Sequence, residues 1–405
     1  MEYTLPMSLQ KLNHLDILRR SERSEITQQR ASELLMVTDR TIRRQLKRLK
    51  KDGPSFLQHG LKGRTSNNRI PLVKEQKIAE LLLTKYPDFG PTFATEKLQD
   101  LHHIVCDTKT VRRIQIQLKL YTPRKNKKQS THRFWRVRRS IYGELAQFDG
   151  SYHNWFEGRN SNTESCLLLA NDDATGDILD AQFAEHEGVL PVMEFWLSYA
   201  GINGIPKAVY LDRFSTYSMN MKLAAENPDT LTQFERAARD VGMQVIHAHS
   251  PQAKGRVENI FGTLQDRLVK ELRLHNICTV GAANIYLRKI FIPAYNRKFR
   301  KPAILPGDLH RKPTKRELTE ILPYIFCRKE TRVIQNDFTI PYKTNWFQLL
   351  PTPKLAMRPK ERVDVHELPD GSIYFTVRGK KANFHILKDR INKKQASACL
   401  KTLTT

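Results

Sequence analysis

Three acidic residues in the middle of the chain could meet at one site. They are Asp149 in QFDGS, Asp212 in YLDRFSTY and Glu258 in SPQAKGRVENIFGTLQDRL. Two carboxylates about 4 Å apart repel each other by about 4 kcal/mol at an effective dielectric constant of about 20, so such a group stays ionised only with cations. Oxygen ligands suit Mg²⁺ or Mn²⁺, and two such ions favour phosphoryl transfer, in which they activate one oxygen and stabilise the leaving oxygen.

Each acid taken alone has a simpler interpretation. An Asp at the end of a strand often caps a helix or belongs to a turn, and Glu258 could lie on a solvated helix face. The neighbouring Asp172 and Asp173 could compete as ligands, but a DDATG turn more often supplies hydrogen bonds to a hairpin. His247 and His249 alternate on one strand, where a structural role suits them at least as well.

Residues 143–274 alternate between strand and helix patterns that could position the acids. We expect strands at 144–150, 166–171, 178–183, 207–212 and 244–249, and helices at 189–199, 231–241 and 255–272. This order predicts a mixed sheet with helices on both faces. Asp149 and Asp212 would then end their strands, where residues of neighbouring strands converge.

The charge of the chain indicates a polyanionic partner. Lys and Arg total 68 against 42 Asp and Glu, a net charge of +26, and the basic residues are clustered. Residues 40–51 and 121–140 contain many basic residues and no acid. A basic protein with solvated lysines is the alternative. Lys254 and Arg256, just before Glu258, would contact a nucleic-acid backbone.

Residues 1–60 fit a helix-turn-helix DNA-binding domain. The pattern is a helix at 26–35, a tight turn and a basic helix at 39–49, with Thr27 and either Thr38 or Asp39 as caps. The side chains expected to face DNA are Arg40, Thr41, Arg43, Arg44 and Lys47. A basic amphipathic helix on an ordinary protein surface is the alternative.

Residues 72–120 predict a second helical DNA-binding module, with helices around Ile78, at 95–101 and from residue 107. Its last helix begins like the first basic helix, and the side chains expected to face DNA are Lys109, Thr110, Arg112 and Arg113. A helical bundle that only packs is the alternative. The basic linker at 121–140 can neutralise phosphates or serve as a plain connector.

The rest of the chain adds a domain and excludes some classes. Short apolar spacings at 325–390 predict a small β barrel or sheet with a tight turn at Pro369–Ser372.

No run approaches the about 20 apolar residues of a membrane span, and no secretory signal is recognisable. The five cysteines form no CxxC pair, which argues against a disulfide framework or a cysteine zinc site. We expect a cytoplasmic protein without a membrane partner.

The acidic segments together resemble a known family, the DDE-type bacterial insertion-sequence transposases (ISNCY-like) with a retroviral-integrase-like core. The matching residues of the most specific segment are Gln252, Lys254, Gly255, Arg256 and Glu258. The resemblance implies an RNase-H-like core at 141–298 and two Mg²⁺ or Mn²⁺ ions per site. Asp149, Asp212 and Glu258 fall on the three metal-binding acids of the family.

One interval departs from the family pattern. Residues 213–257 separate Asp212 from Glu258, whereas integrase-like cores usually have about 35 residues there. The surplus fits an insertion around 218–228, which makes Asp212 the position whose geometry most needs checking.

The resemblance implies a multidomain DNA transposase: N-terminal all-α helix-turn-helix modules, a central α/β RNase-H-like core and a C-terminal small β barrel or sheet. We expect it to bind the terminal inverted repeats of its element, to cleave there and to join the ends to target DNA. A homo-oligomer, a dimer or larger, and a bacterial, nucleoid-associated location follow from this. A non-catalytic sequence-specific DNA-binding regulator derived from a transposase, or a simple RNase-H-like nuclease, are the alternatives.

Overall fold

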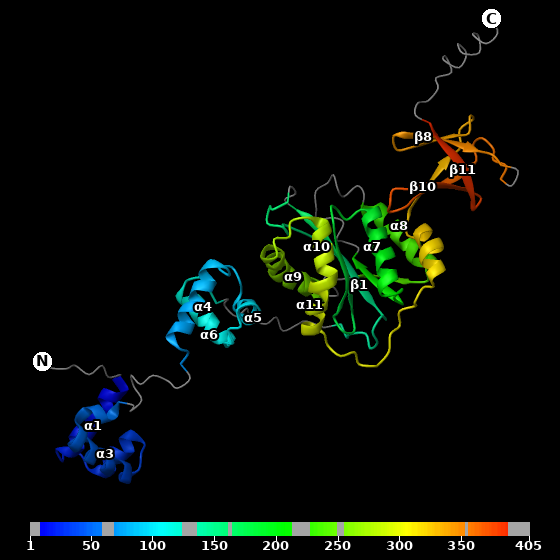
Figure 1. Cartoon of the computed structure of the whole chain (residues 1–405). Coiled ribbons are helices and arrows are strands. Elements are labelled where there is room, and N and C mark those ends of the chain that lie inside the picture. The colour runs from blue at the N-terminus through cyan, green and yellow to red at the C-terminus, as the bar shows by residue number, and fades with distance from the viewer. Residues whose placement is uncertain are drawn as a thin grey trace, which may run out of the picture. The chain divides into compact units, whose positions relative to one another are not determined.

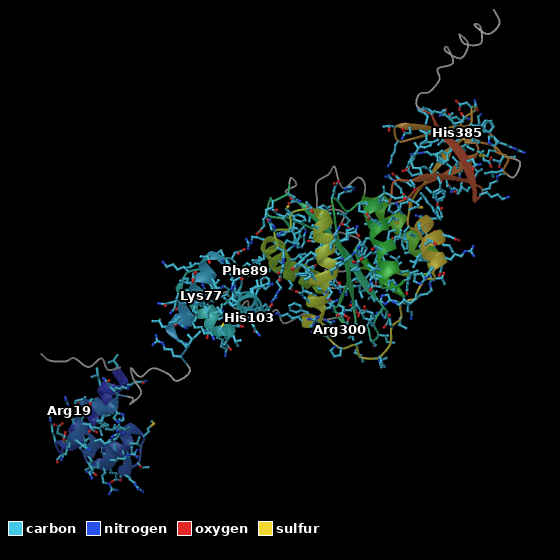
Figure 2. All side chains as sticks on the ribbon, in the orientation of Figure 1. Arg19, Lys77, Phe89, His103, Arg300 and His385 are labelled. Atoms are coloured by element: carbon cyan, nitrogen blue, oxygen red, sulfur yellow. The ribbon has the colours of Figure 1, made fainter. Side chains whose placement is uncertain are left out.

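The computed structural model describes residues 9–58, 69–123, 136–160, 164–212, 227–248, 255–352 and 355–387, without the side chains of residues 212, 227–232 and 248. The chain divides into two compact units, residues 1–124 and 125–405. Figure 1 labels their elements, and Figure 2 shows their side chains in the same orientation. Among the described helices, none combines the length and the apolar character needed to cross a membrane.

The first helices form a small group around one apolar core. They are α1 (Leu9–Glu22), α2 (Gln28–Leu35), α3 (Asp39–Asp52) and η1 (Gly53–Leu57). The predicted caps are confirmed, because Thr27 Oγ1 accepts a hydrogen bond from a backbone N–H of α2 (3.1 Å) and Thr38 Oγ1 accepts one from α3 (3.3 Å). The buried side of α3 consists of Ile42, Leu46 and Leu49.

The second helical group contains α4 (Leu72–Thr84), α5 (Pro91–His102) and α6 (Thr108–Gln117). The second of these helices begins at Pro91 and not near Thr95 as expected, because proline fits the first turn of a helix, where no backbone donor is needed. Asp107 caps α6 by accepting a hydrogen bond from the Lys109 backbone N (2.6 Å).

The second unit contains a five-stranded mixed sheet. Its strands are β1 (Ala146–His153), β2 (Ser165–Asp172), β3 (Ile178–Ala184), β4 (Ala208–Asp212) and β5 (Gln244–Ala248). The strand order is β3-β2-β1-β4-β5. The first three strands are antiparallel, whereas β4 is parallel to both β1 and β5. The predicted mixed sheet is therefore present.

Helices cover both faces of this sheet, as predicted. One face packs against α7 (Val189–Ile202) and α8 (Asn227–Asp240), and the other packs against α9 (Gly255–Leu274), α10 (Val280–Tyr286), η3 (Leu287–Phe291) and α11 (Ile292–Phe299). Within β2, Leu168 belongs to the first core and its neighbours Leu167 and Leu169 belong to the second. The continuous apolar run of β2 follows from this burial on both faces.

The C-terminal part is an antiparallel sheet preceded by η4 (Glu317–Ile321) and α12 (Leu322–Ile325). Its strands are β6 (Arg328–Val333), β7 (Thr339–Tyr342), β8 (Asn345–Leu350), β9 (Arg362–Glu367), β10 (Ile373–Val377) and β11 (Lys380–Leu387), in the order β6-β9-β10-β11-β8-β7. Gly371 has a positive φ of 81° in the predicted turn between β9 and β10. A small β sheet is thus the form that this region takes.

Candidate functional site

Asp149 and Asp212 lie at the same level of two adjacent parallel strands. The β1–β4 ladder pairs Ala146 with Val209 and Gln147 with Tyr210. Asp149 lies two positions after Gln147, and Asp212 lies two positions after Tyr210, so both acids share one register position. The longer interval after Asp212 leaves β4 intact, and β4 is paired along its length with β5.

The position of Asp149 within its strand differs from the prediction. We expected a strand at 144–150 that ends beside Asp149, but β1 runs to His153 because its antiparallel pairing with β2 continues to Ser165. Asp149 therefore lies in the middle of β1, half-buried. The prediction that Asp149 ends its strand is therefore wrong, although Asp149 lies just beyond the last pair of the parallel ladder to β4.

Strand alternation places Asp149 on the face of the sheet that α9 covers. Ala146 and Phe148 belong to the core beneath α7 and α8, so Gln147, Asp149 and Ser151 point to the opposite face. Ser151 Oγ accepts a hydrogen bond from Gln265 Nε2 of α9 (3.3 Å).

Glu258 lies in the first turn of α9 and is exposed. Near one end of the contact between α9 and β1, Arg256 and Gln147 bind the same carboxylate, that of Asp173. At the other end Gln265 binds Ser151. The helix segment 256–265 spans about 13.5 Å and the strand segment 147–151 about 13 Å. The helix therefore runs alongside β1 in the same direction, with Glu258 and Asp149 between the two contacts.

Among the side chains that the structure describes, no group of three or more His, Cys, Asp and Glu could hold a metal ion. The side chain of Asp212 and residues 213–226 are not among those that the structure describes. On the other face of the sheet, a Cβ added at Gly150 would be 2.5 Å from Glu187 Oε2, so this acid lies across the sheet from Asp149. The glycine of QFDGS thus leaves room for a neighbouring carboxylate.

Asp172 is a structural residue of the β2–β3 hairpin. It is fully buried and accepts hydrogen bonds from the backbone N of Gly143 (3.0 Å), the backbone N of Thr175 (2.7 Å) and the Thr175 hydroxyl (2.8 Å). Burial raises the pKa of Asp172, although these hydrogen bonds oppose the shift. The hairpin interpretation of the DDATG turn agrees with these contacts.

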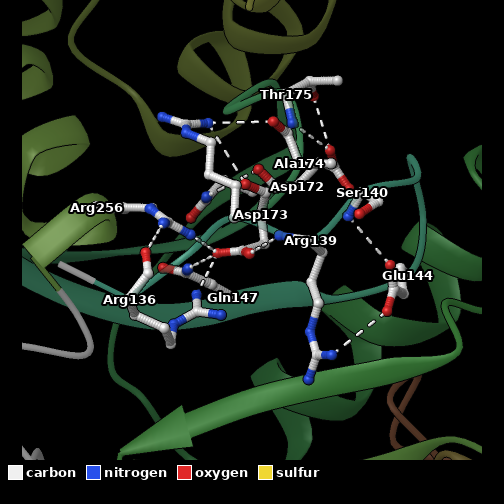
Figure 3. Close-up of polar contacts among 12 residues, drawn as sticks. Arg136, Arg139, Ser140, Glu144, Gln147, Asp172, Asp173, Ala174, Thr175 and Arg256 are labelled. Atoms are coloured by element: carbon white, nitrogen blue, oxygen red, sulfur yellow. Dashed lines mark hydrogen bonds and ion pairs between the residues drawn. The ribbon is translucent and has the colours of Figure 1, made fainter. Parts of the chain in front are cut away.

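Asp173 is the centre of a buried polar cluster (Figure 3). Its carboxylate binds the guanidinium groups of Arg136 and Arg256 and the Gln147 amide, and it accepts a hydrogen bond from the Arg139 backbone N (2.8 Å). Burial alone would raise the pKa of Asp173, but the hydrogen bond from Arg139 and the charges of Arg136 and Arg256 lower it below its usual value. Nothing in the sequence pattern singles out these partners.

The guanidinium group of Arg256 binds other residues of the protein. One terminal nitrogen binds Asp173 and the other donates to the Arg136 carbonyl. The expected contact of Arg256 with a DNA backbone therefore lacks support from the geometry. Lys254 and His249 lie outside the described residues. His247 lies 2.9 Å from Glu235 of α8, which fits the structural interpretation of this histidine.

The expected DNA-facing residues of α3 lie on its surface. Arg40, Arg43, Arg44 and Lys47 are exposed, and no ion pair joins them to another described residue. Thr41 is half-buried, and its hydroxyl is 3.0 Å from that of Thr38. The basic side of α3 is therefore open to a ligand.

Two of the corresponding residues of α6 contact other side chains of the same helical group. Lys109, Arg112 and Arg113 are exposed and Thr110 is half-buried, but Arg113 forms a 2.9 Å ion pair with Glu75 of α4. The Arg112 guanidinium lies 5.4 Å from the centre of the Tyr121 ring. Part of the basic surface of α6 thus holds this helical group together.

Comparison with known proteins gives two relatives that span most of the chain. No family model matches. A protein of Sinorhizobium fredii (strain NBRC 101917 / NGR234) named "Putative transposase y4bF" is 33% identical over 370 residues, 91% of this chain and 79% of its own length. The "Transposase for insertion sequence IS1202" of Streptococcus pneumoniae is 27% identical over 394 residues, 87% of this chain and 81% of its own length.

Solved structures are more distant. A chain of a simian T-cell lymphotropic virus intasome in complex with PP2A regulatory subunit B56 gamma is 15% identical with a TM-score of 0.33, covering 77% of this chain and 100% of that chain. The HTLV-2 integrase catalytic core domain in complex with magnesium is 15% identical with a TM-score of 0.26, covering 38% and 91%. The Mos1 transposase paired-end complex is 9% identical with a TM-score of 0.18, covering 73% and 100%. TM-scores this low carry no argument here.

The family assignment rests on the sequence relatives. At 33% identity over 91% of the chain, the similarity extends well beyond the three acidic segments, and a second relative agrees with it. The resemblance drawn from those segments is confirmed: the chain belongs to the bacterial insertion-sequence transposases.

Proposed function

We propose that this transposase cleaves DNA at the terminal inverted repeats of its element and joins the freed ends to target DNA, with Asp149, Asp212 and Glu258 as its catalytic acids. The observation that carries the proposal is the shared register position of Asp149 and Asp212 on adjacent parallel strands. Alternation assigns position 212 to the same face as position 210, as it assigns Asp149 to the face of Gln147. That face carries α9, whose first turn contains Glu258.

A divalent cation fits the chemistry of these residues. Three carboxylates offer oxygen ligands only, which Mg²⁺ and Mn²⁺ prefer over softer donors, and they would hold two ions per site. When bound, such ions activate the attacking oxygen and stabilise charge on the leaving oxygen.

The protein's own part in the reaction is to hold the acids and the DNA. The paired strands β1 and β4 fix two acids on a rigid sheet, and the contacts of Arg256 and Gln265 fix the helix that carries the third. Water would attack first, and the freed 3′-hydroxyl would attack the target strand in a second step. No covalent bond to the protein forms in either step.

The exposed basic side of α3 supports recognition of DNA. Arg40, Arg43, Arg44 and Lys47 can reach base edges and phosphates when α3 enters the major groove. The second helical group, with Lys109 and Thr110 on α6, would extend the footprint. We further propose an RNase-H-like core, a homo-oligomer that holds two DNA ends, and a cytoplasmic, nucleoid-associated location.

Strand transfer tests the catalytic assignment. A labelled duplex from the end of the element is incubated with a target plasmid and Mg²⁺, and joined products are measured for the full chain and for Asp149→Asn, Asp212→Asn and Glu258→Gln. Each variant should lose joining while it keeps DNA binding. The matched control is Glu185→Gln, at an exposed acid of the same unit, which should join normally. Normal joining by any triad variant would remove that acid from the proposal. Wild-type chain that binds the repeat without joining it would indicate a DNA-binding regulator.

A further inference from the structure

Asp173 binds residues from two separate elements and from the segment that enters the core. Gln147 belongs to β1, Arg256 to α9, and Arg136 to the chain segment before the sheet. The Arg136 guanidinium also lies 5.4 Å from the centre of the Tyr210 ring of β4. We call Asp173, Arg136, Gln147, Tyr210 and Arg256 the Asp173 cluster. Figure 3 shows Arg136, Gln147 and Arg256 around this carboxylate.

Three members of the Asp173 cluster each precede one of the three acids by two positions. Gln147 precedes Asp149 by two positions, Tyr210 precedes Asp212 by two, and Arg256 precedes Glu258 by two. On a strand, two positions keep the same face and advance about 6.7 Å. On a helix they advance about 3 Å but turn by about 200°, so Arg256 and Glu258 lie on different sides of α9. The Asp173 cluster therefore precedes Asp149 and Asp212 by one same-face step on their strands and involves the same first turn of α9 that carries Glu258.

We infer that Asp173 is a positioning residue for the acidic triad: its buried carboxylate ties β1, α9 and, through Arg136, β4 to one point. The inference rests on the proposed function, because it concerns the same three acids. It gives the second Asp of the DDATG turn a task in catalysis, although Asp173 itself would touch neither DNA nor metal.

The energetics of the cluster favour this arrangement over a loose contact. The Asp173 side chain has no exposed area, and those of Arg136 and Arg256 are only 30% and 23% exposed. Arg256 also donates to the Arg136 carbonyl, so the two guanidinium groups are held close together by the single carboxylate. Without that charge they would repel each other in a partly buried site, and the first turn of α9 would shift away from β1.

A shift of this kind should weaken metal binding. Loss of a group that orients metal ligands typically costs about 10- to 100-fold in affinity or activity. A general loss of folding stability should not weaken metal binding in this specific way. The control is therefore a variant that loses a similar ion pair elsewhere in the protein. Asp180 on β3 offers one: it is 2% exposed and pairs with Arg288 at 3.0 and 3.1 Å, and Arg288 lies in η3, outside the elements that carry the triad.

The experiment measures Mn²⁺ binding to the full chain by electron paramagnetic resonance, at a temperature where circular dichroism shows every variant folded. Asp173→Asn should weaken Mn²⁺ binding at least about tenfold, whereas Asp180→Asn should bind like the wild type despite a similar loss of thermal stability. Equal Mn²⁺ binding by the two variants would overturn the inference.

Arg256→Lys provides a second test if Asp173→Asn does not fold. A lysine keeps the charge but cannot bind Asp173 and the Arg136 carbonyl with a planar fork, so Mn²⁺ binding should again be weaker, and wild-type binding would contradict the inference. Asp149→Asn tests the proposed metal site separately from the role of Asp173. Unchanged Mn²⁺ binding in Asp149→Asn would refute the proposed metal site itself, whatever Asp173→Asn does.

Discussion

Two groups of acids in the second unit contrast sharply in their surroundings. Asp172, the last residue of β2, and Asp173, which follows it, are fully buried and accept hydrogen bonds from the protein. Asp149 is half-buried in β1, and Glu258 is exposed at the start of α9. Asp172 and Asp173 stabilise the fold through these contacts, whereas Asp149 and Glu258 are the acids that solvent reaches and that we propose as cation ligands. Sequence alone does not separate the groups, because all four are acids beside apolar runs.

The largest expected contrast is between Asp149→Asn and Asp172→Asn. The first should reduce strand transfer about 10³-fold, equivalent to about 4 kcal/mol, with little change in thermal stability. The second places an NH₂ group where Asp172 accepts hydrogen bonds from Gly143 and Thr175, so it should lower the free energy of unfolding by about 1–3 kcal/mol. Joining rates and urea unfolding of both variants measure this, and the comparison fails if Asp172→Asn keeps full stability.

The pH dependence of stability sharpens the description of the buried pair. Because the pKa of Asp173 is lowered in the folded state, its contribution is complete above the ordinary Asp pKa of about 4 and is lost as the pH falls below that value. The difference in unfolding free energy between wild type and Asp173→Asn should therefore shrink as the pH falls below about 4. Asp172, whose pKa is raised, should contribute less as the pH rises above about 4. Urea unfolding as a function of pH checks both, and parallel profiles would show that the two acids do not differ.

The two basic helices also differ in whether their charges pair inside the protein, with a smaller expected effect. Arg43 and Arg44 of α3 are exposed without an ion pair among the described residues, whereas Arg113 of α6 pairs with Glu75. Alanine at Arg43 or Arg44 should weaken binding to the terminal repeat and reduce the slope of log K against log salt by about one. Alanine at Arg113 should change the slope little and stability by less than about 1 kcal/mol. Equal slopes for all three variants would argue against a special role for α3.

The order of elements could be predicted because each has a local signal. The caps at Thr27 and Thr38, the apolar side of α3 and the strand–helix alternation of the core all appear in the sequence as periodicity and turn residues. The C-terminal strands were predicted on the same basis. The helices after α9, by contrast, were not predicted, because the expected elements of the core end at residue 272.

The site could be predicted only in part, because its supporting contacts are long-range. The extension of β1 beyond Asp149 depends on its pairing with β2, which no local pattern reveals. Arg256 was expected to face DNA because it is basic and near Glu258, but its guanidinium binds Asp173, which lies far away in sequence. Arg136 belonged to a recognised basic run, yet its partner could not be inferred from charge alone.

Exchange of a metal ligand tests the central claim most directly. Asp149→Cys replaces an oxygen ligand by a thiolate, which binds Mg²⁺ poorly and softer ions better. In the strand-transfer reaction with the element's own end, the account predicts loss of joining with Mg²⁺ and partial recovery with Mn²⁺. The exposed control Glu185→Cys should behave like wild type with both ions. Joining by Asp149→Cys at the wild-type rate in Mg²⁺ would contradict a metal-binding role for Asp149 and with it the proposed active site.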